Sequence, residues 1–382
     1  MWNDSECWFV LQGIMCLYRL FYGWGRIGIE RCKCTIRPFL YVAIGVFSER
    51  KLCYNEPNAE MLYPIKGIHA DKRIMEEAAM EYTMNQAPQR VLDMRKAWAT
   101  GDAIRDAGLT EPESVEKFRD ISYGPYDTWN LLDLYLPKDA GKDTDCALPV
   151  IVSIHGGGFF YGDKELYRFY CMHLAEFGFA VVNYNYRLAP EFHFPAPIED
   201  AAAVLRWISA NAESFGLDKC NVFMVGDSAG AQLVSQMACI LSNSEYADLF
   251  GLDLPKDVTL RAVSLACGVY NFPTAAEAGE EGIFIDYFGE ASVLDDERAK
   301  VLDHITADYP PAFVFSAYCD TLYAACEPMA KLIAERGGES EFRIYGAPDK
   351  PEISHVFHVN MKLAEGEKAN RDQTEFFRRH MA

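Results

Sequence analysis

The segment Gly226–Gly230 reads Gly-Asp-Ser-Ala-Gly and lies between the apolar run Asn221–Val225 and the helical pattern Ala231–Leu241. In a sharp turn from a strand to a helix the central residue takes a strained backbone conformation, and glycines on either side remove side-chain clashes. The serine hydroxyl then projects from the carboxyl end of the sheet, where α/β folds bind their ligands. The segment therefore predicts that Ser228 is a nucleophile. The alternative is a glycine–serine turn that only caps the helix.

A second segment, His155–Gly158, reads His-Gly-Gly-Gly and follows a β-branched run. Consecutive glycines let backbone N–H groups converge on one point without obstruction by side chains. Acyl transfer needs such donors, because the carbonyl oxygen gains negative charge in the tetrahedral intermediate. We expect the amides of Gly157, Gly158 and Ala229 to form this oxyanion hole. Three glycines alone would more often be a flexible loop, and we expect the ring of His155 only to brace that loop.

A serine hydroxyl at neutral pH needs a general base, and that base needs a carboxylate to orient it. In hydrolases with a serine at a strand–turn–helix bend, the chain order is serine, acid, histidine. Asp320 directly follows the strand-like run Ala312–Ala317, which places its carboxylate at the carboxyl end of a strand. We predict Asp320 as the acid, although an aspartate here could also cap the following helix.

Four histidines follow Ser228 in the sequence, namely His304, His355, His358 and His380. His304 precedes the last predicted strands and comes too early in the chain order, and His380 lies near the end of the given sequence, where chains fray. His355 and His358 both lie in a turn-like stretch after the run 340–345. The residues alone leave both histidines open as the base.

Strand-like and helical segments alternate along the chain after Leu109. This alternation predicts an α/β fold with a mostly parallel central sheet flanked by helices. The strands are almost continuously apolar, as in a sheet that is covered on both faces. The predicted strands are 131–136, 148–155, 179–186, 222–225, 262–266, 312–317 and 340–345, and the helices include 198–212, 231–241 and 322–335.

The segment before these strands divides into two parts. Apolar residues recur at three- and four-residue spacing over 71–109, which predicts two or three short helices punctuated by Pro88 and Gly101. We therefore divide the chain into an N-terminal extension 1–60, a helical segment 61–119 and a catalytic domain 120–382.

Residues 1–60 hold two apolar stretches, but 39–47 is only about half of the ~20 residues that a spanning helix needs. The acidic start, with Asp4 and Glu6, is not typical of a signal peptide. Three interpretations remain for this extension: an anchor that contacts a membrane, an N-terminal lid, or a segment without a folding role.

Composition excludes other classes of protein. Lys and Arg number 36 against 56 Asp and Glu, and the net charge is −20. So acidic a protein repels nucleic acids and anionic lipids.

Of the 12 cysteines only Cys32 and Cys34 are close in sequence, which is a weak metal signal without a second pair. We expect reduced thiols in a cytoplasmic protein, with no metal and no cofactor.

Taken together, these segments resemble the hormone-sensitive lipase-like family of α/β-hydrolases, which includes carboxylesterases and lipases. The resemblance covers about residues 120–360. The matching segments are Leu-Leu-Asp-Leu-Tyr-Leu-Pro at 131–137, His-Gly-Gly-Gly-Phe-Phe at 155–160, Tyr-Arg-Leu-Ala-Pro at 186–190 with Pro195, Glu199-Asp200, the serine segment 226–230, Pro310-Pro311, Asp-Thr-Leu at 320–322 and His355–Phe357.

The resemblance implies an α/β-hydrolase fold with Ser228 as nucleophile, Asp320 as acid and His355 as base. The family usually has His-Gly-Phe at the base, whereas this chain has His355-Val356-Phe357, so His358 stays an alternative. In the family, segments before the first strand form a cap over the acyl pocket, and the resemblance implies that role for 61–119.

The implied activity is hydrolysis of small carboxylic esters with short to medium acyl chains, through an acyl-enzyme. Two alternatives stay open: cleavage of amides or peptides on the same scaffold, and binding of a small ligand without catalysis. Phe159, Phe160 and Tyr161 follow the glycines, and we expect them either to line the substrate site or to pack in the core.

Overall fold

The computed structural model describes residues 87–126, 128–138, 147–279 and 281–382. The chain divides at Gln86, and the unit Ala87–Ala382 is described here by itself. The expected extension 1–60, with its proposed membrane contact, and the first part of the segment 61–119 lie outside the described residues. None of the helices that the structure describes is both long enough and apolar enough to cross a membrane.

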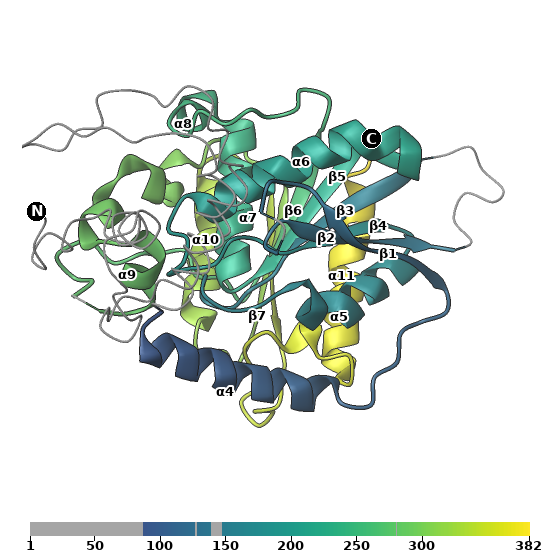
Figure 1. The fold of residues 1–382 in the computed structure, drawn as a ribbon, viewed down its shortest axis with the longest axis horizontal. Helices are drawn as coiled ribbons and strands as arrows, with labels where there is room; N and C mark the ends of the chain where they lie inside the picture. The colour runs from purple at the N-terminus through teal and green to yellow at the C-terminus, as the bar shows by residue number, and fades with distance from the viewer. Residues whose placement is uncertain (1–86, 127, 139–146, 280) are drawn as a thin grey trace, which may run out of the picture. The chain divides into compact units, whose positions relative to one another are not determined.

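Eight strands form one sheet in the order β1-β2-β4-β3-β5-β6-β7-β8 (Figure 1). β1 and β2 are antiparallel to their neighbours, and all pairs from β4 to β8 are parallel. This confirms the predicted α/β fold. The strands are β1 Val115–Ser122, β2 Leu131–Pro137, β3 Leu148–Ile154, β4 Ala180–Tyr184, β5 Leu217–Asp227, β6 Leu260–Ala266, β7 Ala312–Ala317 and β8 Ser340–Tyr345.

Helices cover both faces of the sheet (Figure 1). Residues of α6, α7 and α10 pack in the core on one face, and residues of α5 and α11 pack in the core on the other. The helices are α4 Gln89–Asp106, α5 Lys164–Glu176, α6 Ala196–Phe215, α7 Ala229–Ser242, α8 Ser244–Asp248, α9 Ile283–Phe288, α10 Tyr323–Glu335 and α11 Ala364–Arg379, with short 3-10 turns at Ala291–Asp295, Glu297–Ala299, Val301–His304 and Phe357–Val359.

The central strands are apolar on both sides because each face of the sheet has its own core. Successive side chains of a strand point to opposite faces. Val150 and Val152 of β3 therefore pack with α6 and α7, while Ile151 between them packs with α5 and α11. The register pairs Gly226 of β5 with Ile154 of β3 and with Leu265 of β6, so that the carboxyl ends of these three strands lie together.

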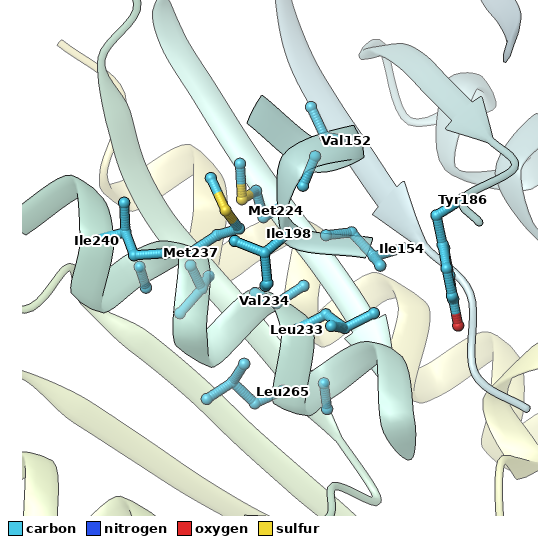
Figure 2. Packing of buried hydrophobic residues seen from close by; sticks show 14 of the residues in the cluster. Val152, Ile154, Tyr186, Ile198, Met224, Leu233, Val234, Met237, Ile240 and Leu265 are labelled. Atoms are coloured by element: carbon cyan, nitrogen blue, oxygen red, sulfur yellow. The ribbon is translucent and has the colours of Figure 1, made fainter. Parts of the chain in front are cut away.

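Helix α7 is buried over nearly its whole length, from Ala229 to Ile240. Figure 2 shows its residues Leu233, Val234 and Met237 among side chains of the strands beneath, including Met224 and Leu265. Most of these buried residues are apolar, and the polar Gln232, Ser235 and Gln236 are buried with them. This packing makes α7 a rigid support for the turn that precedes it.

The domain boundaries differ from those expected from the sequence. Strand β1 begins at Val115, so the expected start of the catalytic domain at residue 120 is too late. A single 18-residue helix, α4, lies in the part of 71–109 that the structure describes. This helix belongs to the same compact unit as the sheet, and its role as part of a cap stays a prediction.

The described cysteines carry free thiols. Cys171, Cys239, Cys267 and Cys326 are buried, whereas Cys220 is exposed and Cys319 lies between the two. The cytoplasmic location stays a prediction.

Replacing Ile240 by Ala tests the contribution of α7 to the core. Ile240 is 2% exposed, and its loss leaves a cavity that should lower the free energy of unfolding by about 2–5 kcal/mol in urea titration. Ile104→Ala is the matched control, because Ile104 also lies in a helix but is 70% exposed. We expect that control to change stability by no more than about 0.5 kcal/mol. Equal losses in the two variants would contradict the packing described for α7.

Candidate active site

Ser228 occupies a sharp turn between β5 and α7. Its backbone has φ 52° and ψ −117°, outside the ordinary region for a residue with a side chain. A Cβ atom at Gly230 would lie 2.1 Å from the carbonyl oxygen of Ile154, so only glycine fits at that position. The Ser228 N–H donates to the carbonyl oxygen of Ala266 at 2.9 Å, which ties the turn to β6.

The backbone of this turn is strained, and packing of the surrounding core must offset the cost. A non-glycine residue in such a conformation costs roughly 1–3 kcal/mol. Buried elements on both sides, β5 and α7, supply the packing that holds it. Because Ser228 is at the N-terminus of α7, the helix dipole favours negative charge that develops near its hydroxyl.

Asp320 and His355 form the acid–histidine pair that the sequence led us to expect. Asp320 follows β7, and its carboxylate Oδ1 lies 2.9 Å from His355 Nδ1. Oδ1 also accepts from the Leu322 N–H at 2.8 Å, and Oδ2 accepts from the Ser316 hydroxyl at 2.8 Å. Four partners around one carboxylate, counting the thiol of Cys267, fix its orientation and therefore that of the imidazole.

The Asp320 carboxylate remains charged although its side chain is buried. Burial raises the pKa of a carboxyl group, but the hydrogen bond from His355 and the charge of that ring lower it more, and the pKa lies below its ordinary value. A charged acceptor at Nδ1 places the Nδ1 proton toward Asp320. The other nitrogen, Nε2, is thereby left to accept a proton.

His358, the alternative base, has a different environment. It is buried, the rings of Tyr170 and Phe315 meet it edge to face, and its Nδ1 has no hydrogen-bond partner among the described residues. Burial, with a smaller effect from the charge of His355, lowers the pKa of His358 to about 3. Asp320 is thus paired with His355, whereas His358 is buried in the core, and the roles of acid and base stay predictions.

Val356 explains how the histidine loop forms without the family's glycine. It has φ 59° and ψ 26°, the left-handed conformation that glycine adopts most easily. For a residue with a side chain this conformation costs roughly 1–2 kcal/mol. The loop therefore reaches the backbone shape that a glycine would give, at some cost in stability.

The glycine loop turns tightly after β3. The carbonyl oxygen of Gly157 accepts from the N–H groups of Phe160 at 3.2 Å and of Tyr161 at 3.0 Å, and both Gly157 and Gly158 have positive φ. Within the described part of the chain, the N–H groups of Gly157 and Gly158 donate to no protein acceptor. Ala229, as the first residue of α7, likewise has an N–H without an acceptor inside its helix.

His155 braces this loop from inside the protein. Its ring stacks on Tyr186 with centroids 4.1 Å apart, and the Tyr186 hydroxyl donates to the His155 carbonyl oxygen at 2.9 Å. Burial lowers the pKa of His155 to about 4, so its ring is neutral at pH 7. These contacts fit the structural role that we expected for it.

The aromatic residues after the glycines lie in packed surroundings. Phe159 is 1% exposed and stacks on Tyr287 at 3.9 Å, and Phe160 is fully buried with its ring centroid 4.9 Å from that of Trp98. Tyr161 is half-buried. The contacts of the two phenylalanines are those of core packing, and a role for these three residues in binding substrate stays a prediction.

Helix α4 is held against this region by one arginine. The Arg95 guanidinium donates to the carbonyl oxygens of Phe160 at 2.7 Å and Ala189 at 2.9 Å. It also forms two bonds of 2.7 Å to the carboxylate of Glu191, whose side chain is fully buried. A two-bond ion pair of this kind fixes both distance and angle.

The turn at Ser228 and the Asp320–His355 pair are joined through the chain after β6. The Val269 N–H donates to the Ser228 carbonyl oxygen at 3.3 Å, and the buried Cys267 thiol contacts the Asp320 carboxylate. One ligand atom each of Cys267, Asp320 and His355 lies within 4.8 Å of the others. These three parts of the site therefore share one end of the sheet.

The same three residues are the one group among the described residues that could hold a metal ion. Asp320 and His355 already bond to each other, however, and burial raises the pKa of the Cys267 thiol well above its ordinary value. Metal ligation needs a thiolate, which this surrounding disfavours. The arrangement suits an imidazole that is oriented by a charged carboxylate and can exchange a proton at Nε2.

Sequence reasoning did not single out Cys267, Asp227 or Tyr167, all of which are buried near the turn. Asp227 lies within the serine segment, which was a signal for its position though not for its contacts. Tyr167 and Cys267 carry no motif that could have pointed to them.

A family model described as alpha/beta hydrolase fold matches residues 151–359. The chain belongs to this family and, by the esterases among its relatives, to the hormone-sensitive lipase-like carboxylesterases.

The relatives are named as ester hydrolases. The chain is 31% identical over 211 residues to the probable carboxylic ester hydrolase LipM of Mycobacterium tuberculosis, a match that covers 53% of this chain and 48% of LipM. It therefore spans about half the length of that relative. It is 26% identical over 278 residues to the ethyl acetate hydrolase of Pseudomonas putida, covering 69% and 82% of the two chains.

Esterase B from Lactobacillus rhamnosis is a similar solved structure. The TM-score is 0.67 at 27% identity, and the match covers 77% of this chain and 96% of that one. The similarity therefore extends over almost the whole of the solved esterase.

The surroundings of His358 predict acid sensitivity of the fold. The pKa of His358 is about 3 in the folded state and about 6.5 in the unfolded chain. Below pH 6.5 the unfolded chain therefore binds a proton that the folded protein does not, and the free energy of unfolding falls as the pH falls. At pH 5 the loss is about 2 kcal/mol. His358→Phe should remove most of it, measured as the change in the free energy of unfolding between pH 7 and pH 5. An unchanged pH dependence in this variant would show that His358 does not carry the effect.

Proposed function

We propose that the protein hydrolyses carboxylic esters of small molecules by a serine mechanism, through an acyl-enzyme. The observation that carries the proposal is the hydrogen bond of 2.9 Å between Asp320 and His355 at the end of the sheet where Ser228 occupies its strained turn. The names of the relatives support ester bonds as the target.

In the first half of the reaction, the Ser228 oxygen attacks the carbonyl carbon of the ester while His355 Nε2 takes the hydroxyl proton. The imidazolium that forms is stabilised by the Asp320 carboxylate at its Nδ1. The alcohol oxygen then receives the proton from Nε2 as the carbon–oxygen bond breaks. The acyl group remains on Ser228 as an ester.

In the second half, a water molecule loses a proton to the now neutral His355 and attacks the acyl carbon. The tetrahedral intermediate collapses, Ser228 recovers its proton from Nε2, and the carboxylic acid leaves. Both halves pass through an oxyanion, which the amides of Gly157, Gly158 and Ala229 are proposed to bind. Each such donor is worth on the order of 10²–10³ in rate.

Short to medium acyl chains are the proposed substrates. One similar structure is of esterase B with a C4-C4 tributyrin phosphonate, and a second relative is named for ethyl acetate. Two large rings after the glycine loop, those of Phe159 and Phe160, are packed in the core next to that loop.

Ser228→Ala should lower kcat/KM for p-nitrophenyl butyrate by roughly 10⁴–10⁶, because the nucleophile is lost. Ser264→Ala is the matched control: Ser264 is also a buried serine near the end of a neighbouring strand, and its hydroxyl has no hydrogen-bond partner among the described residues. We expect the control to retain wild-type rates. A Ser228→Ala variant that hydrolyses the ester at the wild-type rate would refute the proposed mechanism.

Replacing each of the two histidines in a separate variant distinguishes their roles. His355→Ala should lose roughly 10⁴–10⁶ in kcat at pH 7.5, because the proton acceptor is removed. His358→Phe, which keeps a ring in the core, should stay within about threefold of the wild type. The opposite outcome, an active His355 variant beside an inactive His358 variant, would identify His358 as the base.

A further inference from the structure

We propose that Tyr167 is a positioning residue of the ester hydrolysis proposed above, and that together with Asp227 it locks the oxyanion loop to the turn that carries the nucleophile. The inference rests on that proposed function. It concerns two buried side chains that the steps described above do not use.

Tyr167 connects the two parts of the site directly. Its hydroxyl donates to Asp227 Oδ2 at 2.8 Å and accepts from the Gly156 N–H at 3.0 Å. Asp227 immediately precedes Ser228, and Gly156 immediately precedes Gly157. One hydroxyl group therefore sets the separation between the nucleophile and the first of the proposed oxyanion donors.

The groups in these two hydrogen bonds are buried, so water cannot replace a partner that is lost. Asp227 is 2% exposed and Tyr167 is 7% exposed. A Cβ atom at Gly156 would lie 2.3 Å from Asp227 Oδ2, so the carboxylate fills the space that a side chain would occupy. Removing the tyrosine hydroxyl would leave the buried Gly156 N–H without its hydrogen-bond partner, which destabilises this position of the loop.

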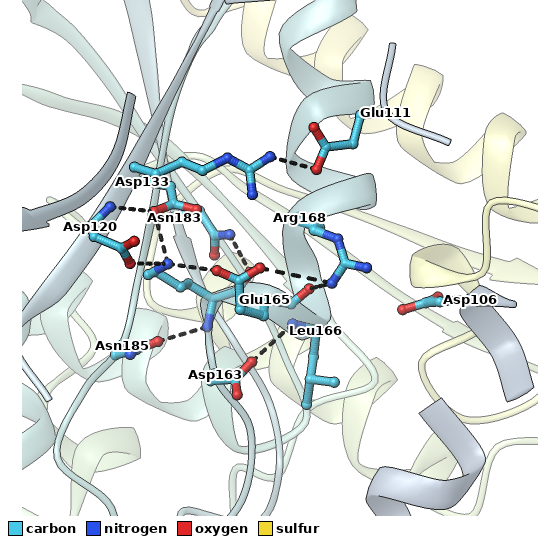
Figure 3. A network of polar contacts seen from close by, with 12 residues as sticks. Asp106, Glu111, Asp120, Asp133, Asp163, Glu165, Leu166, Arg168, Asn183 and Asn185 are labelled. Atoms are coloured by element: carbon cyan, nitrogen blue, oxygen red, sulfur yellow. Dashed lines mark hydrogen bonds and ion pairs between the residues drawn. The ribbon is translucent and has the colours of Figure 1, made fainter. Parts of the chain in front are cut away.

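The helix that carries Tyr167 is itself anchored at its first turn (Figure 3). Asp163 caps α5 by accepting from the Leu166 N–H at 3.0 Å. Lys164 is 3% exposed, and its ammonium lies 2.9 Å from the buried Asp133 and 2.8 Å from Asp120. This network fixes the start of α5 to β2, and Tyr167 lies one turn further along the helix.

The pKa values of Tyr167 and Asp227 are consistent with a lasting hydrogen bond between these two side chains. Burial raises the pKa of Tyr167 well above its ordinary value, so the hydroxyl keeps its proton through the reaction. Burial raises the pKa of Asp227 to about 7, while the bond from Tyr167 and the charge of His355 lower it.

The expected consequence of losing the connection follows from the geometry of oxyanion binding. The donors act on charge that exists only in the transition state, and their effect depends on distances of about 2.7–3.1 Å. A loop that is free to shift should therefore lower kcat and leave KM nearly unchanged. We expect a loss of about 10- to 100-fold, less than the full loss of one donor.

The test is Tyr167→Phe, assayed with p-nitrophenyl butyrate, beside Tyr170→Phe as the matched control. Tyr170 lies on the same helix and is also buried, but its hydroxyl contacts Gln373, away from the loop. Both variants lose one buried hydroxyl. Only Tyr167→Phe should lose kcat, while Tyr170→Phe should lose a similar amount of unfolding free energy with kcat within about threefold of the wild type.

Variants at Asp227 give a second, independent measurement. Asp227→Asn keeps an oxygen that can accept from Tyr167 and should retain more of kcat than Asp227→Ala. If the two residues act as one unit, Tyr167→Phe combined with Asp227→Ala should be no slower than the slower single variant. Should Tyr167→Phe fail to fold, the contrast between Asn and Ala at Asp227 decides the question.

The outcomes separate this inference from the proposed function. A wild type that hydrolyses no ester would refute the proposed function itself. An active wild type with full kcat in Tyr167→Phe, equal losses in Tyr167→Phe and Tyr170→Phe, a loss confined to KM, or fully additive losses in the double variant would each overturn the positioning role alone.

Discussion

The strained backbone conformation of Ser228, with a positive φ of 52° and ψ of −117°, is the constraint on which the rest of the site depends. It costs roughly 1–3 kcal/mol and persists only because buried elements hold both sides of the turn. Strand β5 ends in the turn and α7 begins there, and both are packed in the core. Gly230 lets the turn approach the carbonyl oxygen of Ile154. The buried packing of α7 therefore holds the strained backbone of Ser228, the proposed nucleophile, in place.

Around this turn, parallel strands deliver the remaining groups to the same end of the sheet. The glycine loop follows β3, Asp320 follows β7 and His355 follows β8. Each side chain is then oriented by local contacts: four partners around the Asp320 carboxylate, the ring of Tyr186 against His155, and the hydroxyl of Tyr167 between the glycine loop and Asp227. Electrostatics reinforces the geometry, since the hydrogen bond and charge of His355, together with hydrogen bonds from Cys267 and Leu322, lower the pKa of the buried Asp320 below its ordinary value.

Much of this could be predicted from the sequence, because the central strands are apolar runs that end in recognisable turns. The fold class, the strand positions and the pairing of Asp320 with a downstream histidine follow from local patterns. Strand β1 and helix α11 were missed because they are largely polar, and only their contacts in the folded chain define them. The hydrogen bond of His355, rather than His358, to Asp320 could not be read from the residues alone, since Val356 adopts a conformation that its side chain disfavours. Tyr167 was beyond reach, because nothing in its local sequence reveals a bond to Asp227, 60 residues away.

The most direct measurement is a crystal structure of the protein after reaction with p-nitrophenyl butylphosphonate, whose tetrahedral phosphorus mimics the intermediate of ester hydrolysis. The account predicts phosphorus bonded to the Ser228 oxygen, with the phosphonyl oxygen about 2.7–3.1 Å from the amides of Gly157, Gly158 and Ala229 and with His355 Nε2 facing the Ser228 oxygen. An adduct on another residue, or a phosphonyl oxygen that points away from the glycine loop, would contradict it.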